Sequence, residues 1–374
     1  MKIAMIGQKG ISIFAGGVER HVEEISKRLT KKGHEVTVYC RAIGKAGRST
    51  LENYHGINLK YIPTSENKYL EPIIYTFKAT MDSLTKQYDI IHYHALGPAS
   101  LSFIPKIIGK NVIVTVHGLD WKRDKWGQLA KLYLKFGEKV SARFPDKVIS
   151  VSENLREYYL YKYIKKEDEV IYIPNGVNSQ PLREEKEIMK YGLEKGKYIL
   201  FLARLVPEKG AHYLINAYRD LSTDKKLVIA GGSSYTDSYV NEIKEKNPNN
   251  KIIFTGDVKG PLLEELFSNA FVYVLPSDVE GMPITLLEAM SYRKCCLVSD
   301  IPENVNVIDE DCGFSFKKSD ESDLKRKLEY LLLNPEIVNI TGQKAYEKVV
   351  MHYNWDNISE STEKVYYDVF NKCL

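Results

Sequence analysis

Residues 271–290, FVYVLPSDVEGMPITLLEAM, give the clearest indication of how this chain folds. This stretch opens with an apolar run from Phe271 to Pro276, which is typical of a buried strand. A short polar turn follows. Pro283 then stands where a helix is expected to begin, because proline is favoured at the first helical position. A strand joined by a short loop to a helix is the βα unit from which parallel sheets are built.

Two carboxylates lie within this unit. Glu280 is expected on the loop after the strand, and Glu288 inside the helix. Backbone N–H groups lie between them without helical acceptors, since the first turn of a helix leaves its donors unpaired. The arrangement suits a ligand that carries several hydroxyls and a diphosphate, such as a nucleotide sugar.

Short apolar runs alternate with amphipathic stretches along the whole chain. The strand-like runs of the first half are Lys2–Gly7, Glu35–Cys40, Ile90–Tyr93, Asn111–Val116 and Lys147–Val151. Those of the second half are Tyr198–Ala203, Lys226–Ala230, Lys251–Thr255, Phe271–Leu275 and Cys295–Val298. We therefore predict an α/β protein with two doubly wound, Rossmann-like domains facing a cleft, and a ligand at the carboxyl ends of the strands.

The length of 374 residues also indicates two domains, at about 150 residues each. The turn-rich stretch Ile173-Pro174-Asn175-Gly176 marks the boundary. The domains are expected at 1–177 and 178–356, with the polar segment 178–187 as the linker. Three helices are predicted near the end of the chain, at 319–333, 335–350 and 354–373.

Composition indicates a soluble, cytoplasmic protein. No apolar stretch reaches 18 residues, and the first residues resemble a strand more than a signal peptide. None of the five cysteines forms a Cys-x-x-Cys pair, so we expect reduced thiols. Residues 1–180 carry 28 Lys and Arg against 18 Asp and Glu, whereas 181–374 carry 25 against 31. The basic half is expected to face a membrane surface, a pyrophosphate or nucleic acid, and the alternative is an unevenly charged solvated surface.

Cationic and glycine-rich loops follow the first strand of each half. Gly16 and Gly17 belong to a four-glycine loop that precedes a helix, where a backbone can approach an anion closely. A structural turn is the alternative. Arg204 and Lys209 flank the turn after the first strand of the second half. They could neutralise a diphosphate leaving group, or they could be two solvated cations.

Histidines end two strands of the first half. His117 directly follows the run 111–116 and is expected to face the cleft, although a lone histidine there is more often structural. His92 and His94 end a neighbouring strand. A metal site there is disfavoured, because the pattern lacks an acidic ligand and the His-Glu-x-x-His spacing. The one Asp-x-Asp stretch, 309–311, is interpreted as a surface loop, so no metal is expected.

A basic and aromatic cluster follows His117. It contains Trp121, Lys122, Arg123, Lys125 and Trp126. Tryptophan with Lys and Arg suits a membrane interface, or an acceptor with a sugar and a pyrophosphate. Ordinary packing of helix faces is the alternative. Nucleic acid is not expected, since no recognised binding motif accompanies the charge.

Taken in order, these motifs resemble the family-4 retaining glycosyltransferases of the GT-B fold over nearly the whole chain. The matching parts are 16–19, 33–36, 116–118, 173–177, Arg204 with 208–210, and the pair Glu280 and Glu288. Residues 115–127 are similar to a bacterial subgroup of surface-polysaccharide enzymes that includes rhamnosyltransferases. One departure is Ala203, where the family commonly has glycine.

The resemblance implies a role for each site residue. Glu280 would bind donor-sugar hydroxyls beside the N–H groups of Gly281, Met282 and Ile284, and Glu288 would bind the ribose. Arg204 and Lys209 would hold the diphosphate, with Gly16 and Gly17 closing over it. His117 would stabilise developing oxocarbenium character. The nucleotide base of the donor would lie near Val258. The helix at about 357–374 would return to the first domain.

The function that follows is transfer of a sugar, with retention, from a nucleotide sugar to a glycan or polyprenyl-diphosphate-linked acceptor in surface-polysaccharide synthesis. Neither metal nor cofactor would be required, and the protein would work at the inner face of the cell membrane. Two alternatives stay open. A nucleotide-sugar epimerase would not need Arg204, Lys209 and the acid pair, and a silent binding protein would not need His117.

Overall fold

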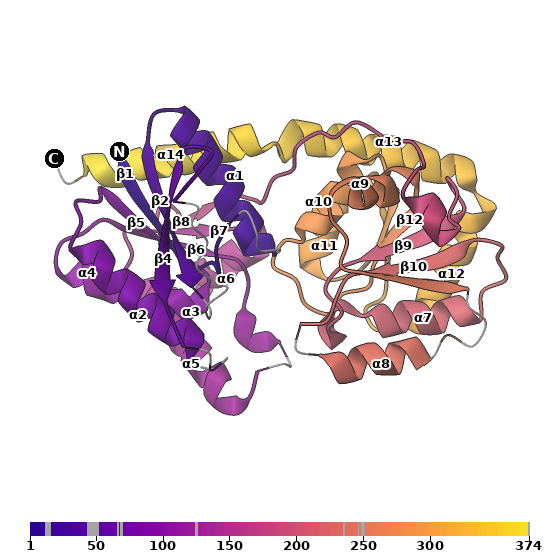
Figure 1. The fold of residues 1–374 in the computed structure, drawn as a ribbon, viewed down its shortest axis with the longest axis horizontal. Helices are drawn as coiled ribbons and strands as arrows, with labels where there is room; N and C mark the ends of the chain where they lie inside the picture. The colour runs from indigo at the N-terminus through magenta and orange to yellow at the C-terminus, as the bar shows by residue number, and fades with distance from the viewer. Residues whose placement is uncertain are drawn as a thin grey trace. The chain divides into compact units, whose positions relative to one another are not determined.

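The computed structural model describes residues 1–11, 16–42, 52–65, 67, 70–123, 126–234, 236–245, 247 and 251–372. Contacts divide the chain into two compact units (Figure 1). Unit 1 comprises 1–175 together with 355–374, and unit 2 comprises 176–354. Each unit is an α/β domain built on its own parallel sheet.

Unit 1 contains an eight-stranded sheet in its described part, in the order β3-β4-β2-β1-β5-β6-β7-β8. All neighbours are parallel except the hairpin of β3 and β4. The first strand, β1, pairs with β2 on one side and β5 on the other, so the direction of winding reverses beside it. The strands are β1 (Lys2–Ile6), β2 (Glu35–Ala42), β3 (Asn53–Tyr54), β4 (Ile57–Pro63), β5 (Ile90–His94), β6 (Val112–Val116), β7 (Lys147–Ser150) and β8 (Val170–Tyr172).

The helices of unit 1 bury one apolar face against this sheet. In α1 (Gly17–Lys31), Val22, Ile25 and Leu29 are fully buried, as their spacing predicts. The others are α2 (Glu71–Leu84), α3 (Leu96–Ala99), α4 (Phe103–Ile107), η2 (Asp120–Lys122), α5 (Gln128–Arg143), α6 (Glu153–Tyr163) and α14 (Trp355–Asn371).

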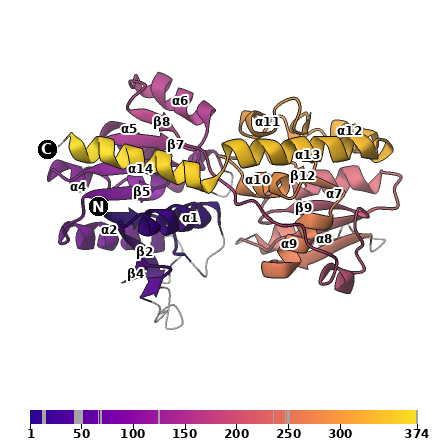
Figure 2. The ribbon, with the colours of Figure 1, turned by 90° about the horizontal axis from the view of Figure 1, so that it is seen from above.

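The last helix, α14, packs on the first domain although it is the end of the chain. Figure 2 shows it beside α1. Glu363 of α14 accepts hydrogen bonds from Lys32 and His34, each at 2.7 Å. The hydroxyl of Tyr366 lies 2.7 Å from Nδ1 of His92 in β5. These contacts attach α14 to unit 1.

Unit 2 contains a six-stranded parallel sheet in its described part, in the order β11-β10-β9-β12-β13-β14. Its strands are β9 (Tyr198–Leu202), β10 (Lys226–Ala230), β11 (Ile252–Gly256), β12 (Val272–Leu275), β13 (Cys296–Ser299) and β14 (Phe314–Phe316). Here too the first strand has neighbours on both sides, and winding reverses between β9 and β12.

Helices and short 3₁₀ turns surround the sheet of unit 2. They are η3 (Ile188–Tyr191), η4 (Pro207–Lys209), α7 (Ala211–Arg219), α8 (Asp237–Glu245), α9 (Gly260–Asn269), α10 (Ile284–Ser291), α11 (Pro302–Ile308), α12 (Glu321–Leu333) and α13 (Pro335–His352). Pro283 does not occupy the first position of α10. It is the extended residue just before the helix, with φ −75° and ψ 112°.

The predicted fold class is confirmed, since both units are Rossmann-like parallel-sheet domains. Each of the ten predicted strands lies on an observed one. Four strands were not predicted, namely β3, β4, β8 and β14. Three of them have only two or three residues, too few for a periodic pattern. Within the described residues, no helix has the length and apolar character needed to cross a bilayer.

Candidate active site

The loops that contain the residues predicted to bind the diphosphate and the sugar lie where the winding of unit 2 reverses. Arg204 and Lys209 follow β9, and Glu280 follows β12, the adjacent parallel strand. The carboxyl ends of adjacent parallel strands meet at one edge of the sheet. The two loops are therefore neighbours in space although about 70 residues separate them in sequence.

The structure brings Lys209 and Glu280 into direct contact. The Lys209 ammonium donates a hydrogen bond to Oε1 of Glu280 in a buried ion pair. Their side chains are only 14% and 6% exposed. Sequence reasoning placed the two residues on different parts of a ligand and did not predict this contact. It joins the predicted diphosphate-binding cation and the predicted sugar-binding carboxylate in one ion pair.

Gly210 holds the two loops close together. Its backbone is left-handed, with φ +70°, and a Cβ there would lie 2.0 Å from the carbonyl oxygen of Pro276. Only glycine tolerates both the conformation and the close approach. The turn after β9 can therefore lie directly on the end of β12, which brings Lys209 to Glu280.

Glu208 is a residue whose position the sequence did not reveal. It is 6% exposed, and within the described residues its two carboxylate oxygens have no hydrogen-bond partner. Its carbonyl oxygen accepts a hydrogen bond from the N–H of Asp278 at 2.9 Å. An acid immediately before Lys209 was the available clue, but only the fold shows that it is buried beside the Glu280 loop.

The remaining donor-binding candidates of unit 2 occupy two loops and one helix. Glu288 is half-buried on α10, and Ile284 is the first residue of that helix. Met282 and Gly281 are buried in the preceding loop. Arg204 is exposed after β9. Val258 is half-buried between β11 and α9.

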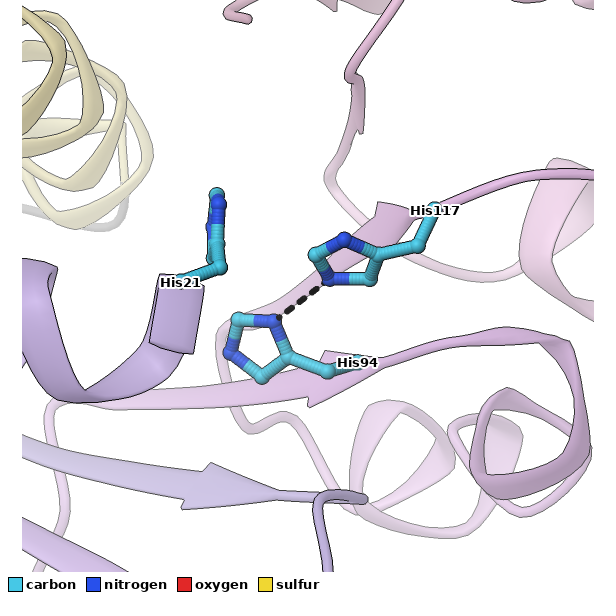
Figure 3. Close-up of side chains that lie close together, drawn as sticks. All are labelled: His21, His94 and His117. Carbon is cyan, nitrogen blue, oxygen red and sulfur yellow. Dashed lines mark hydrogen bonds between the residues drawn. The ribbon is translucent and has the colours of Figure 1, made fainter. Parts of the chain in front are cut away.

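The predicted residue His117 belongs to a cluster of three histidines in unit 1. Figure 3 shows His21, His94 and His117 converging from α1, from the end of β5 and from the residue after β6. One ring nitrogen from each lies within 4.8 Å of those of the other two. The cluster lies at the carboxyl end of β5, where winding reverses beside β1.

Hydrogen bonds orient the three rings. Nδ1 of His94 lies 3.2 Å from Nε2 of His117, and Nε2 of His94 lies 3.5 Å from the sulfur of Met5. Nδ1 of His21 lies 2.9 Å from Oδ1 of Asn175. Because an amide oxygen only accepts, His21 carries its proton on Nδ1 and keeps a lone pair on Nε2.

The cluster is uncharged at neutral pH. Burial lowers the pKa of His21 to about 4, despite the opposing effect of the hydrogen bond that its Nδ1–H donates to Asn175. Burial also lowers the pKa of His94 and of His117 well below the ordinary range, and neighbouring imidazoles lower both further. Neutral imidazoles offer lone pairs, which suits hydrogen bonding to a ligand or coordination of a metal.

His92 does not join the cluster in the way the sequence suggested. Its ring is bonded to two hydroxyls, those of Tyr366 and Thr115, each at 2.7 Å. His92 and His94 therefore do not act together as a ligand pair. The partners of His94 are His117, 23 residues later, and His21, which the sequence did not identify as a candidate.

The glycine loop precedes α1, as predicted. Gly16 is the residue before the helix and Gly17 its first residue. Residues 12–15 of the loop lie outside the described part of the chain. Gly7, at the end of β1, has φ +131°, and a Cβ there would lie 2.3 Å from the carbonyl oxygen of His94. This close approach places the start of the loop beside the histidines.

The aromatic cluster is organised by a buried acid that the sequence did not reveal. Glu138, in α5, is 0% exposed. Four side chains donate to its carboxylate, namely Trp121, Tyr158, Lys162 and Tyr163. Trp121 and Trp126 both pack against the apolar core of unit 1. Packing therefore accounts for much of this cluster.

The cations of the cluster differ in environment. Lys122 is exposed, and Arg123 forms an ion pair with Asp120 at 3.4 Å. Lys125 lies outside the described residues. The exposed apolar side chains are on α5 instead, where Leu129, Leu132 and Phe136 are 84%, 66% and 50% exposed.

The fold and these sites define a class of enzyme, the glycosyltransferases with two Rossmann-like domains of the GT-B type. Residues 15–180 match the family described as Glycosyltransferase Family 4, and residues 183–348 match Glycosyl transferases group 1. The chain therefore carries both domains of a family 4 and group 1 glycosyltransferase.

Known proteins similar to this chain agree with that class. An uncharacterized glycosyltransferase of Methanocaldococcus jannaschii is 28% identical, with 98% of each chain covered. The Escherichia coli UDP-Gal:alpha-D-GlcNAc-diphosphoundecaprenol alpha-1,3-galactosyltransferase is 24% identical, with 95% of each covered. The structure of Anabaena HepE in complex with UDP-glucose is 16% identical and aligns with a TM-score of 0.81, covering 98% of this chain and 100% of that one.

Proposed function

We propose that this protein is a retaining glycosyltransferase that moves a hexose or deoxyhexose from a nucleotide sugar to a polyprenyl-diphosphate-linked or glycan acceptor in surface-polysaccharide synthesis. The observation that carries the proposal is the buried pair of Lys209 and Glu280 at the reversal point of unit 2. Ligands of open α/β sheets bind at such points. A carboxylate and a cation there match the hydroxyls and the diphosphate of one donor.

Arg204 and Lys209 hold the diphosphate in this proposal. Negative charge grows on the leaving phosphate as the glycosidic bond breaks, and two fixed cations stabilise that charge. They take the part that a divalent metal has in other sugar transfers, so the proposed reaction needs no metal. At the start of α1, Gly16 and Gly17 offer backbone N–H groups that suit an anion.

The two carboxylates recognise different parts of the donor. Glu280 accepts hydrogen bonds from the sugar hydroxyls, with N–H groups of Gly281, Met282 and Ile284 nearby. Glu288, half-buried one turn into α10, accepts from the ribose diol. The nucleobase of the donor contacts the loop that contains Val258.

His117 acts on the donor sugar as a neutral imidazole. Burial keeps its pKa well below the usual value, so it contributes a dipole and no positive charge beside the developing oxocarbenium ion. Retention follows from front-side attack, in which the leaving phosphate accepts the proton of the acceptor hydroxyl. No protein side chain then has to serve as nucleophile.

A thermal-shift screen with UDP-, GDP-, dTDP- and ADP-sugars tests donor binding. UDP-glucose and UDP-galactose come first, because similar proteins are named for UDP-Gal or solved with UDP-glucose. At 100 times Kd a donor should stabilise the fold by about 2.7 kcal/mol, equally with and without EDTA. Binding that needs Mg²⁺ or Mn²⁺ would contradict the metal-free site, and interconversion of the donor without acceptor would indicate an epimerase.

We further propose that unit 1 binds the inner face of the membrane to reach a lipid-linked acceptor. Leu129, Leu132 and Phe136 are exposed on α5 at spacings of three and four residues, so they form one apolar stripe. The exposed Lys135 and Lys139 lie on the same helix. An apolar stripe flanked by lysines is typical of helices that lie in an anionic membrane interface.

Flotation with anionic liposomes tests this surface. At low salt we expect the protein to float, and the double change Leu132→Gln and Phe136→Gln to reduce the floated fraction several-fold. The matched control is Leu333→Gln with Met351→Gln, which removes two apolar side chains of unit 2 that are at least as exposed. Absence of flotation, or equal loss in the control, would rule out a membrane contact through α5.

A further inference from the structure

We propose that His21, His94 and His117 form a binding site for a divalent transition metal of the Zn²⁺ type, with three imidazole ligands and a fourth position open to water or another ligand. No carboxylate takes part. The site is distinct from the diphosphate-binding residues of unit 2, and nothing in the proposed transfer reaction requires it.

Distances within the cluster fit such an ion. Zinc–nitrogen bonds of about 2.0–2.1 Å place tetrahedral ligand atoms roughly 3.3 Å apart. The nitrogens of His94 and His117 already lie 3.2 Å apart. All three ligand nitrogens lie within 4.8 Å of one another, so no pair has to approach by more than about 1.5 Å to reach that spacing.

The surroundings of the rings favour coordination as well. Metal-binding histidines usually donate their second N–H to an oxygen acceptor, which fixes the tautomer. Nδ1–H of His21 makes this bond with Asn175, so its Nε2 lone pair is available. Nε2 of His94 faces the sulfur of Met5, which leaves Nδ1 for the metal.

The backbone holds the ligands on three separate elements. His94 ends β5, and Ala95 after it has φ +69°, an uncommon conformation for a residue with a side chain. A strained backbone conformation persists where the surrounding structure holds it in place. At Ala95 it changes the direction of the chain directly after His94. His21 and His94 are 1% exposed, whereas His117 is only partly buried and gives access to the fourth position.

The ligand set determines which ions are selected. Three neutral nitrogens suit Zn²⁺, Co²⁺, Ni²⁺ or Cu²⁺, whereas Mg²⁺ and Ca²⁺ prefer oxygen ligands. The site should therefore not bind the Mg²⁺ that accompanies nucleotides in the cell.

Metal binding has a consequence that rests on the proposed function. A metal on His117 occupies the imidazole that the proposal assigns to the donor sugar. Zn²⁺ is then an inhibitor of transfer, and EDTA restores activity. Binding of the metal is independent of this consequence and can be measured without donor or acceptor.

The test measures Zn²⁺ binding to untagged protein by competition with a chelating dye, and records the visible spectrum with Co²⁺. We expect one equivalent of each ion, d–d bands of a four-coordinate nitrogen site, and no response to Mg²⁺. His21→Gln and His94→Gln should each lose stoichiometric binding, while His352→Ala, which removes an exposed histidine of α13, should keep it. Circular dichroism confirms that the variants are folded.

Asn175→Ala provides a second variant that keeps all three ligands. Loss of the bond to His21 should weaken Zn²⁺ binding about 10–100-fold, the usual effect of removing such a partner. Absence of one tightly bound equivalent in the wild type, or its retention in His21→Gln and His94→Gln, would overturn the proposal. Binding without inhibition of transfer would leave the metal site standing and contradict the role of His117 at the donor.

Discussion

Replacement of Glu280 by Gln is expected to reduce turnover more than 100-fold. The change keeps the size of the side chain and removes its charge. The sugar hydroxyls then lose a charged acceptor in a buried site, where such hydrogen bonds stabilise by a few kcal/mol. Lys209 also loses the negative charge of its partner in a buried ion pair. A hundred-fold loss corresponds to about 2.7 kcal/mol.

The measurement is sugar transfer by purified Glu280→Gln at saturating donor. Glu310→Gln, a change of an exposed acid in the same unit, is the matched control and should retain full turnover. Calorimetric melting shows whether unit 2 is still folded. Near-normal turnover of Glu280→Gln would count decisively against a role for this carboxylate in the reaction.

Replacement of Glu138 by Leu is expected to destabilise unit 1 by on the order of 3 kcal/mol, because four donors lose their shared acceptor. Leucine fills a similar volume, so the effect reports the lost hydrogen bonds more than a cavity. Lys162 can regain water, since its side chain is 44% exposed. The cost therefore comes mainly from the half-buried indole and phenol groups.

Urea denaturation followed by tryptophan fluorescence measures this effect in unit 1 alone. The chain has three tryptophans, Trp121, Trp126 and Trp355, and all belong to that unit. Glu157→Leu, on the exposed side of α6, is the control and should leave the midpoint nearly unchanged. Equal midpoints for Glu138→Leu and wild type would show that the network does not stabilise the fold.

The contribution of Glu138 should also depend on pH. Burial alone would raise the pKa of this carboxyl, but hydrogen bonds from Lys162, Tyr163, Tyr158 and Trp121 outweigh it and lower the pKa. A lowered pKa in the folded state means that the stabilisation is complete above the ordinary pKa of Glu and is lost as pH falls through the folded value. The difference between wild type and Glu138→Leu should therefore shrink in acid.

Much of the fold could be predicted because a parallel strand buried on both faces is a continuous apolar run. β1, β6 and β9 are of this kind, and each was recognised from composition alone. β4 was missed because polar residues interrupt it, as in its run INLKYIP. β8 and β14 are too short to show a period.

The positions of candidate site residues were predictable where one local motif contains several of them. Glu280 and Glu288 share one loop and helix, and Arg204 and Lys209 share one turn, so their spacing could be interpreted directly. The roles assigned to these residues remain proposals. Sequence spacing could not show that Lys209 pairs with Glu280, because that contact depends on which strands are neighbours.

Local periodicity and turn chemistry were enough to predict the α/β class, ten of the described strands and the loops that hold the charged residues. Which of those loops meet became visible in the folded chain alone. The Lys209–Glu280 pair, the four donors on Glu138, and the convergence of His21, His94 and His117 all join residues distant in the chain. The order of strands in each sheet determines which of these residues come into contact. That order depends on long-range packing, which no short stretch of residues encodes.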